Sequence, residues 1–461
     1  MSKHLWSGRF DGAPDPAAFD FGVSFRFDRR FFEDDVTGSL AWAEALAGAG
    51  VLTPADAEAI RLALTAILEE GRRDPAWVAG DDEDVHSFVE RQLVARIGDA
   101  GRRLHTGRSR NEQVSLDFRL YLRRRIPLLQ RKIAELVGVF ADQAEKAGGA
   151  LMPSYTHLRR AMPVLVAHHL LSHAAALRRD YDRLARAAAE ADALPLGSGA
   201  IAGTSYAVDT AALAKRLGFS RVVPNSIDAS SDRDFAATFL HATALAMVHL
   251  SRIAEDFILF TSEEFGFYEL ADQSATGSSM MPQKKNPDPL ELVRGKSGRA
   301  VGHLTGFLTT MKGLPTGYNK DLQEDKEPVF DAEDTLTVSL EATTAVIRRL
   351  TLRPTVTRRA ASGLLLATDV ADYLVSRGVA FRQAHEVVGA LVRRLHKEGR
   401  TFEDLSPEEW RAASADFGDD VREAVTPERS VATKRTPQST HPDQVAAMLA
   451  ETRAWVSACP R

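Results

Sequence analysis

The sequence has little of what marks secreted, membrane-bound or nucleic-acid-binding proteins. Its single cysteine, Cys459, cannot form a disulfide within the chain, which fits a reducing compartment. No uninterrupted apolar run reaches the length of a membrane span, and the first residues lack the apolar segment of a signal peptide. The formal net charge of -5 indicates no surface for a polyanion. We therefore expect a cytoplasmic protein without nucleic-acid or membrane partners.

Strand signals are scarce as well, and helical periodicity dominates the chain. With 461 residues, the chain is too long for a single compact core. The sequence predicts an all-α protein of three domains: a helical domain with an extended arm at residues 1–108, a central bundle of long helices at 109–356 and a small helical domain at 357–461. The arm covers residues 1 to about 28, which are rich in Gly, Pro, Asp and Phe.

Four long segments of the central region carry continuous apolar faces. One runs to about Lys146, and the others cover about 163–193, 231–265 and 288–312. At 1.5 Å per residue the first reaches roughly 55 Å, longer than a small domain is wide. Helices of this length protrude from a monomer, so their apolar faces are expected to meet partner helices. An oligomeric multi-helix core is therefore predicted.

The segment at residues 277–287 has the order Gly-Ser-Ser-Met-Met-Pro-Gln-Lys-Lys-Asn-Pro. Glycine and proline prevent a continuous helix here and leave backbone N–H groups free to face a ligand. The hydroxyl of Ser278, the amine of Lys284 and the amide of Asn286 would then line an anion-receiving loop. On composition alone, a Ser/Lys-rich surface connection is the more common interpretation.

A second polar segment, at residues 105–111, has the order His-Thr-Gly-Arg-Ser-Arg-Asn. Ser109 or Thr106 can cap a long helix whose first turn presents Arg110 and Asn111. A helix N-terminus beside arginines attracts carboxylates through its free N–H groups and its dipole. The alternative is a solvated basic helix start.

Two further segments carry candidate residues. Prolines at 153 and 163 bracket a short turn that should hold Thr156 and His157 rigidly, and Glu291 on a later helix could support a histidine. The tract at residues 317–327 is mixed in charge, and its acidic residues are interpreted as a solvated loop. Ser24, near the end of the arm, is either a hydroxyl at a helix start or a hydrogen-bond donor to a substrate.

Two other patterns are interpreted as structural. His169 and His173 stand one helical turn apart, which could suit a metal ion, but no cysteine or carboxylate stands near them in the sequence. A packed or solvated pair, and no metal site, is therefore expected. The glycines at residues 197–202 resemble a dinucleotide fingerprint, but a helix precedes them, so a glycine-rich turn is expected.

The order of residues 277–287 resembles the signature of the fumarase/aspartase superfamily of lyases. Its Gln283-Lys284-Lys285 version is similar to argininosuccinate lyase and to the related delta-crystallin, whereas fumarases and aspartases usually have Gly-Lys-Val and adenylosuccinate lyases His-Lys-Arg. Residues 105–111 and 318–326 and the Tyr-Thr-His-Leu at 155–158 match the same family. The resemblance extends from about Trp6 to about Val445.

This resemblance implies the reversible cleavage of argininosuccinate to arginine and fumarate by β-elimination without a cofactor. It also implies a homotetramer whose sites lie where three subunits meet. Catalytic roles are implied for Ser278, His157, Lys284 and Glu291. Substrate contacts are implied for Ser24, Arg110, Asn111, Thr156, Asn286, Tyr318, Gln323 and Lys326.

The division of acid and base roles is left open by the sequence. The unperturbed pKa of histidine lies near neutrality, which favours His157 as the base, whereas the resemblance indicates Ser278. Two other classes of protein also fit the residues. A sister lyase acting on adenylosuccinate, malate or aspartate would share the fold, and a structural protein of the delta-crystallin type would keep the bundle without turnover.

Overall fold

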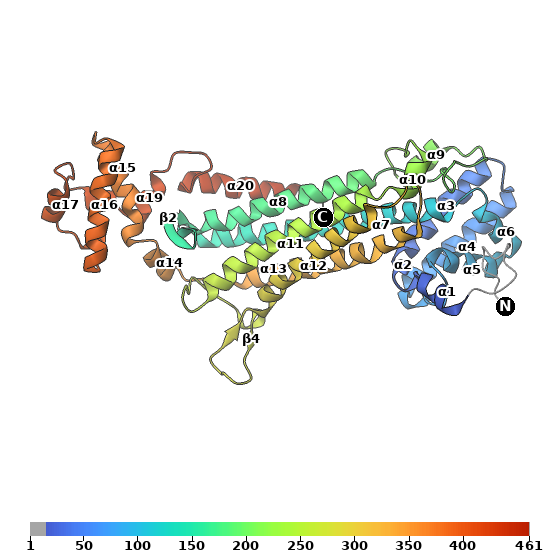
Figure 1. Ribbon diagram of the computed structural model, residues 1–461, viewed down its shortest axis with the longest axis horizontal. Coiled ribbons are helices and arrows are strands. Elements are labelled where there is room, and N and C mark those ends of the chain that lie inside the picture. The colour runs from blue at the N-terminus through green and yellow to red at the C-terminus, as the bar shows by residue number, and fades with distance from the viewer. Residues whose placement is uncertain (1–14, 461) are drawn as a thin grey trace. The chain divides into compact units, whose positions relative to one another are not determined.

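The computed structural model describes residues 15–460, and most of them are helical (Figure 1). The predicted all-α class is confirmed, and no helix described is long and apolar enough to cross a membrane. Contacts divide the chain into two compact units. Unit 1 holds the described residues up to Leu128 with Arg183–Ala242 and Val301–Glu333, and unit 2 holds Leu129–Asp182, Thr243–Ala300 and the residues from Asp334 on.

Five long helices supply segments to both units: α7 (Arg110–Ala147), α8 (Val166–Ala191), α11 (Asp234–Thr261), α12 (Asp288–Met311) and α13 (Lys326–Arg349). The four predicted long segments are confirmed as α7, α8, α11 and α12. The fifth, α13, was not predicted. Its sequence contains several threonines and valines, which have low helix propensity, so tertiary packing decides its structure.

Shorter helices complete unit 1: α1 (Pro16–Gly22), α2 (Phe25–Asp28), α3 (Phe32–Gly48), α4 (Pro54–Arg73), α5 (Val85–Ile97), α6 (Asp99–Arg102), α9 (Thr210–Leu217) and α10 (Ser226–Ser231). The extended arm expected up to residue 28 is wrong from Pro16 on, because α1 and α2 form there. Asp15 caps α1 by accepting the backbone N–H of Ala18 at 3.0 Å, and Pro16 follows at the first helical position. The part of the arm at residues 1–14 lies outside the described residues.

Unit 2 contains three small two-stranded sheets: β1 (Leu151–Thr156) with β2 (Arg159–Leu165), β3 (Tyr268–Glu269) with β6 (Thr351–Leu352), and β4 (Thr276–Gly277) with β5 (Lys285–Asn286). The turn expected between two prolines is thus the tip of a β-hairpin. Pro153 faces Pro163 in this hairpin, and neither has an N–H to donate. The Ser154 hydroxyl stabilises the irregular stretch by donating to the carbonyl oxygen of Met162 at 2.8 Å.

The remaining helices of unit 2 are α14 (Pro354–Ala360), α15 (Ala367–Ser376), α16 (Phe381–Glu398), α17 (Pro407–Ala413), α18 (Val421–Ala424), α19 (Pro427–Ala432) and α20 (Pro442–Ala458). Buried side chains between Leu366 and Val425 form an apolar core of their own around Trp410. In contrast, α20 contacts α7, because Arg453 donates to Asp142 at 2.5 Å. The division into three domains at residues 108 and 356 stays a prediction.

A buried charge cluster joins α3, α5 and α7 in unit 1. His86 Nδ1 lies 2.8 Å from Asp35 Oδ1 and 3.3 Å from Asp117 Oδ2. Burial acts to raise the pKa of Asp35, but the hydrogen bond and charge of His86 and the charge of Arg108 lower it to about 2. Burial and the charge of Asp35 raise the pKa of Asp117 well above its usual range. Of the two carboxyl groups, Asp35 therefore ionises first as the pH rises, and Asp117 keeps its proton to a higher pH.

This asymmetry predicts different stabilities for two isosteric variants. Asp117→Asn puts a neutral isostere in place of the carboxyl group that keeps its proton longer, so the free energy of unfolding should change by about 1 kcal/mol or less. Asp35→Asn removes the carboxylate that accepts the hydrogen bond of Gln113, pairs with His86 and faces the buried Arg108, and it should cost about 3–5 kcal/mol. Urea unfolding at pH 7 and fixed protein concentration measures both values. Equal destabilisation by the two substitutions would show that the charges are assigned wrongly.

Candidate active site

A capping box holds the first turn of α7, at the beginning of the predicted carboxylate-binding segment. Ser109 Oγ accepts the backbone N–H of Asn111 at 3.2 Å, and Glu112 Oε1 accepts the N–H of Ser109 at 3.1 Å. Ser109 is thus the cap, and Thr106 is not. Arg110 donates to Asp84 Oδ1 at 2.6 Å. Because Asp84 is itself the N-cap of α5, this ion pair joins the starts of α5 and α7.

The glycine-rich turn at residues 197–203 packs against this helix start, so its interpretation as a turn is confirmed. The N–H of Gly197 donates to Glu112 Oε2 at 2.8 Å, and Asn111 Nδ2 donates to the carbonyl oxygen of Ala200 at 3.2 Å. Gly199 has a φ of 56°, and a Cβ atom there would lie 2.5 Å from the carbonyl oxygen of Gly203. Only glycine fits this approach of two backbone segments.

Ser24 stands at the N-cap position of α2, but its hydroxyl does not cap the helix. Its Oγ donates instead to Asp28 Oδ2 at 2.5 Å, and Asp28 Oδ1 accepts the backbone N–H of Val85 at 3.0 Å. Burial raises the pKa of Asp28 to about 6, although the charges of His86 and Lys326 act against this shift. Ser24 is therefore held by a buried carboxyl group at the start of α5.

Lys326, at the first position of α13, belongs to a buried triad of charges. Asp325 accepts from Arg233 Nε at 2.5 Å and from Lys326 Nζ at 2.8 Å. The three residues are only 1–3% exposed. The acidic residues of this tract were expected to be solvated, and for Asp325 this is wrong, because two cations offset the cost of its burial. Within the described residues, Arg233 Nη2 is buried without a hydrogen-bond partner.

The other predicted residues of unit 1 lie around this triad. Burial raises the pKa of Tyr318 to about 12, and the charges of Arg233 and Asp84 act on the same hydroxyl. Gln323 Nε2 donates to the carbonyl oxygen of Gly22 at 3.2 Å, two residues before Ser24 in the chain. Unit 1 therefore gathers Ser24, Arg110, Asn111, Tyr318, Gln323 and Lys326.

In unit 2, His157 occupies the tip of the β1–β2 hairpin. Thr156 pairs with Arg159, so only His157 and Leu158 form the loop, with φ values of 53° and 55°. Two consecutive left-handed residues are what a two-residue type I′ hairpin loop requires. Histidine tolerates this region better than leucine does, and the strain is held by the hairpin. The tip therefore presents the imidazole in a fixed position, with Thr156 and His157 both exposed.

The predicted anion-receiving loop connects β4 and β5 and projects from the helices of unit 2 (Figure 1). The hydroxyl oxygen of Ser278 accepts the backbone N–H groups of Met281 at 3.0 Å and of Met280 at 3.3 Å. Such donors stabilise negative charge on the oxygen they contact. The loop thus forms an N–H nest around the oxygen of Ser278 itself.

The two adjacent lysines of this loop have different environments. Lys285 Nζ donates to Asp272 Oδ1 at 2.7 Å and to the carbonyl oxygen of Leu270 at 2.5 Å, so it ties the loop to its base. Lys284 is exposed, and its amine makes no hydrogen bond or ion pair in the part of the chain that the structure describes. Asn286 lies in β5, where its backbone pairs with Thr276. Of the two amines, that of Lys284 is the one available to a ligand.

Glu291 lies in the first turn of α12 and is exposed. Its nearest cation is Arg294, at 3.7 Å. Among residues 15–460, no hydrogen bond or ion pair joins it to His157, so the support of His157 by Glu291 stays a prediction. Unit 2 thus carries Thr156, His157, Ser278, Lys284, Asn286 and Glu291.

Sequence reasoning missed four charged residues that hold the candidate residues in place: the buried Asp28, Arg233 and Asp325, and the half-buried Asp84 in its pairing with Arg110. Asp325 directly precedes Lys326, and Arg233 stands next to the start of α11. For Asp84, Arg233 and Asp325, the position at a helix start was a visible signal. Their burial was not, because it depends on contacts between helices far apart in the sequence.

The expectation for the histidine pair of α8 needs a correction. Asp256, from α11, lies 3.3 Å from the Nε2 atoms of both His169 and His173. The missing carboxylate is thus present, more than eighty residues further along the chain. The rings also pack against Phe257 and each other, so the pair is packed as expected.

A family model described as Lyase matches residues 8–302, and one described as Argininosuccinate lyase C-terminal matches residues 364–432. An EDDS lyase solved in complex with formate has a TM-score of 0.83 and 27% sequence identity, covering 97% of this chain and 93% of that chain. A class II fumarase from Schistosoma mansoni has a TM-score of 0.77 at 15% identity over 89% of this chain and 94% of that chain, which shows the fold alone.

The fold and the matched model define a lyase of the fumarase/aspartase superfamily. A relative from Desulforudis audaxviator (strain MP104C), argininosuccinate lyase, is 47% identical over 98% of this chain and 99% of the relative. The chain belongs to the argininosuccinate lyase family.

The raised pKa of Asp28 predicts a pH-dependent stability. The ordinary pKa of 3.8 becomes about 6 in the folded state. The contribution of this carboxyl group to the free energy of unfolding is therefore fully present below pH 3.8 and is lost as the pH rises through 6. The loss amounts to roughly 3 kcal/mol. Asp28→Asn keeps the acceptor for Val85 and cannot ionise, so the variant should gain stability over the parent chain between pH 4 and 7.

Thermal midpoints of both proteins, recorded across this pH range at one protein concentration, measure the effect. Parallel pH curves for Asp28→Asn and the parent would mean that Asp28 is already ionised at pH 4 and would contradict the assignment.

Proposed function

We propose that this chain catalyses the reversible cleavage of argininosuccinate to arginine and fumarate, in cytoplasmic arginine biosynthesis. Membership of the argininosuccinate lyase family along the whole chain carries this conclusion. The reaction is a β-elimination. A base removes a proton from the carbon next to a carboxylate, and the electron pair spreads into that carboxylate. The pair then forms the double bond of fumarate as the C–N bond breaks. The electrons of the C–N bond stay on the departing guanidino nitrogen, which takes a proton from an acid.

We assign the base to Ser278. A serine hydroxyl is a very weak acid, so its alkoxide needs strong stabilisation. The two N–H groups of Met280 and Met281 that point at Ser278 Oγ support this role, because they would stabilise charge on that oxygen at no cost of reorganisation. The exposed amine of Lys284 carries a positive charge. It would stabilise the substrate carboxylate into which the electron pair of the carbanion spreads.

His157, held at the hairpin tip, is assigned to the protonation of the departing nitrogen, directly or through a partner. An imidazole has one nitrogen that can donate a proton and one that can accept it. Glu291 is assigned to the orientation of His157, and Thr156 to a contact with substrate. The strained left-handed backbone of His157 supports a functional position, because such strain persists where the surrounding structure fixes it.

The residues gathered in unit 1 suit the binding of carboxylate groups. The triad of Arg233, Asp325 and Lys326 holds two cations and one anion, which leaves an excess of positive charge in a buried place. The start of α7 adds backbone N–H groups and the amide of Asn111. We assign Ser24, Arg110, Asn111, Tyr318, Gln323 and Lys326 to substrate binding, together with Asn286 of unit 2.

We further propose a homotetramer whose sites combine residues of different subunits. Exposed apolar and small residues along α12 support helix–helix association. Leu292, Val301 and Leu308 on this helix are 62%, 43% and 49% exposed. A Cβ atom added to its glycines, at 295, 298, 302 and 306, would meet no atom within 4 Å. Exposed apolar and small side chains along a long helix favour close contact with partner helices.

The reaction and its base are tested by fumarate release, followed by ultraviolet absorbance. Purified protein should release fumarate from argininosuccinate and not from adenylosuccinate, malate or aspartate. Ser278→Ala should lower the rate by about 10²–10⁴-fold, because the base is lost. Ser279→Ala removes the neighbouring hydroxyl from the same loop and should keep the rate within about threefold.

Equal losses in Ser278→Ala and Ser279→Ala would contradict Ser278 as the base. Fumarate release from only one of the rival compounds would show that this compound, and not argininosuccinate, is the substrate. A folded protein inactive on all four compounds would indicate a structural protein of the delta-crystallin type.

A further inference from the structure

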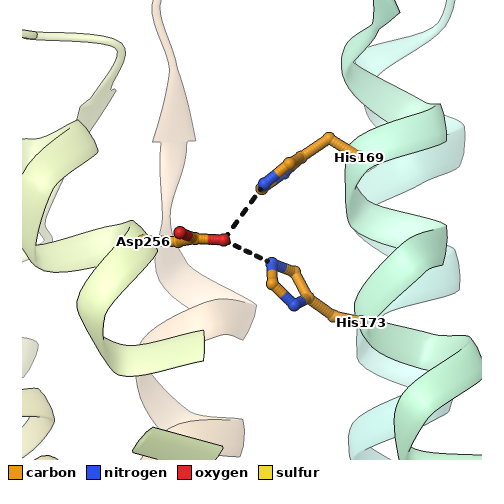
Figure 2. Close-up of side chains that lie close together, drawn as sticks. All are labelled: His169, His173 and Asp256. Atoms are coloured by element: carbon orange, nitrogen blue, oxygen red, sulfur yellow. Dashed lines mark hydrogen bonds and ion pairs between the residues drawn. The ribbon is translucent and has the colours of Figure 1, made fainter. Parts of the chain in front are cut away.

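Two helices bring three potential metal ligands together in unit 2, and none of the three is assigned to catalysis. His169 and His173 project from one face of α8, one turn apart, toward Asp256 on α11 (Figure 2). The Nε2 atoms of both histidines lie 3.3 Å from the same oxygen, Asp256 Oδ2. All three ligand atoms lie within 4.8 Å of one another. Sequence reasoning could not find this set, because Asp256 stands far from the histidines in the chain.

These distances are poor for hydrogen bonds between charged groups. A charge-assisted bond from an imidazolium to a carboxylate is about 2.7–2.9 Å long. At 3.3 Å the contact of His169 is a long hydrogen bond, and His173 Nε2 is buried without a hydrogen-bond partner in the described part of the chain. A buried nitrogen aimed at a carboxylate that it does not bond calls for a further partner.

The same distances suit ligands that share a metal ion. A tetrahedral zinc ion lies about 2.0–2.1 Å from each nitrogen or oxygen ligand, which places neighbouring ligand atoms about 3.3 Å apart. Both contacts of Asp256 Oδ2, at 3.3 Å, have this spacing.

The surroundings hold the two imidazoles in position. Their rings meet edge to face at a centroid distance of 4.8 Å. His173 packs against Phe140 at 5.5 Å, and His169 packs against Phe260 at 5.4 Å. Aromatic packing of this kind fixes the side-chain rotamers before an ion arrives and limits the access of water.

We propose that His169, His173 and Asp256 form a binding site for one divalent transition-metal ion of the zinc and cobalt type. Two imidazole nitrogens and one carboxylate oxygen select such ions over Mg²⁺ and Ca²⁺, which prefer oxygen ligands alone. Three protein ligands leave a fourth tetrahedral position for water or a further side chain.

A bound ion would clamp α8 to α11 beside the hairpin that carries His157. The hairpin ends at Leu165, directly before α8. Its Tyr155 also packs against Phe260 at 5.9 Å, and Phe260 packs against His169. The ion would thus stabilise the base of the hairpin, and the chemistry at Ser278 needs no part of it.

Cobalt titration of untagged, chelator-treated protein tests the site. Co²⁺ should bind at one ion per chain, with the visible absorption bands of a four-coordinate ion, and Zn²⁺ should displace it. His169→Gln and Asp256→Asn should weaken binding by at least about tenfold. His168→Gln alters the neighbouring histidine of α8, which is not in the triad, and should bind Co²⁺ like the parent chain.

Circular dichroism establishes that each variant is folded before titration. The absence of stoichiometric Co²⁺ binding by the parent chain would overturn the proposal. So would equal affinities in His169→Gln and His168→Gln, because the ion would then be bound elsewhere.

Discussion

The buried triad of Arg233, Asp325 and Lys326 is the constraint on which the organisation of unit 1 depends. It joins the start of α11 to the start of α13, and each charge is stable there only because the others are present. A single buried ion would cost several kilocalories per mole. The triad also leaves an excess positive charge beside Tyr318 and Asp28. The same interaction that fixes the helix ends therefore creates a place for an anionic substrate.

Helix ends rather than helix middles carry the candidate chemistry. Arg110 and Lys326 begin α7 and α13, and Glu291 lies in the first turn of α12. Backbone N–H groups are unpaired in these first turns, so polar side chains and anions are stabilised there. The long helices supply rigidity, and the loops between them supply Ser278 and His157. This separation lets a rigid bundle hold polar loops, including the strained tip at His157, at the ends of its strands and helices.

Periodicity and local chemistry were enough to predict four of the five long helices and to narrow the cap of α7 to Ser109 or Thr106, of which Ser109 is the cap. They did not predict the structure of segments whose conformation depends on tertiary contacts. Thr- and Val-rich α13 has weak helix propensity, α1 and α2 formed in a segment rich in glycine and proline, and the hairpin around His157 contains two prolines. The buried state of Asp325 and the meeting of Asp256 with His169 depend on neighbours far away in the sequence. Local reasoning therefore found the residues but not their partners.

We propose that Asn111 and Ser278 of one active site come from different subunits. The most direct measurement mixes two inactive variants, Asn111→Ala and Ser278→Ala, by unfolding and refolding them together at equal concentrations. With random mixing, about one site in four of all the refolded tetramers should contain both intact residues, so fumarate release should return to roughly a quarter of the parent rate. Hybrid tetramers without activity would contradict the account, because both residues would then have to come from the same subunit.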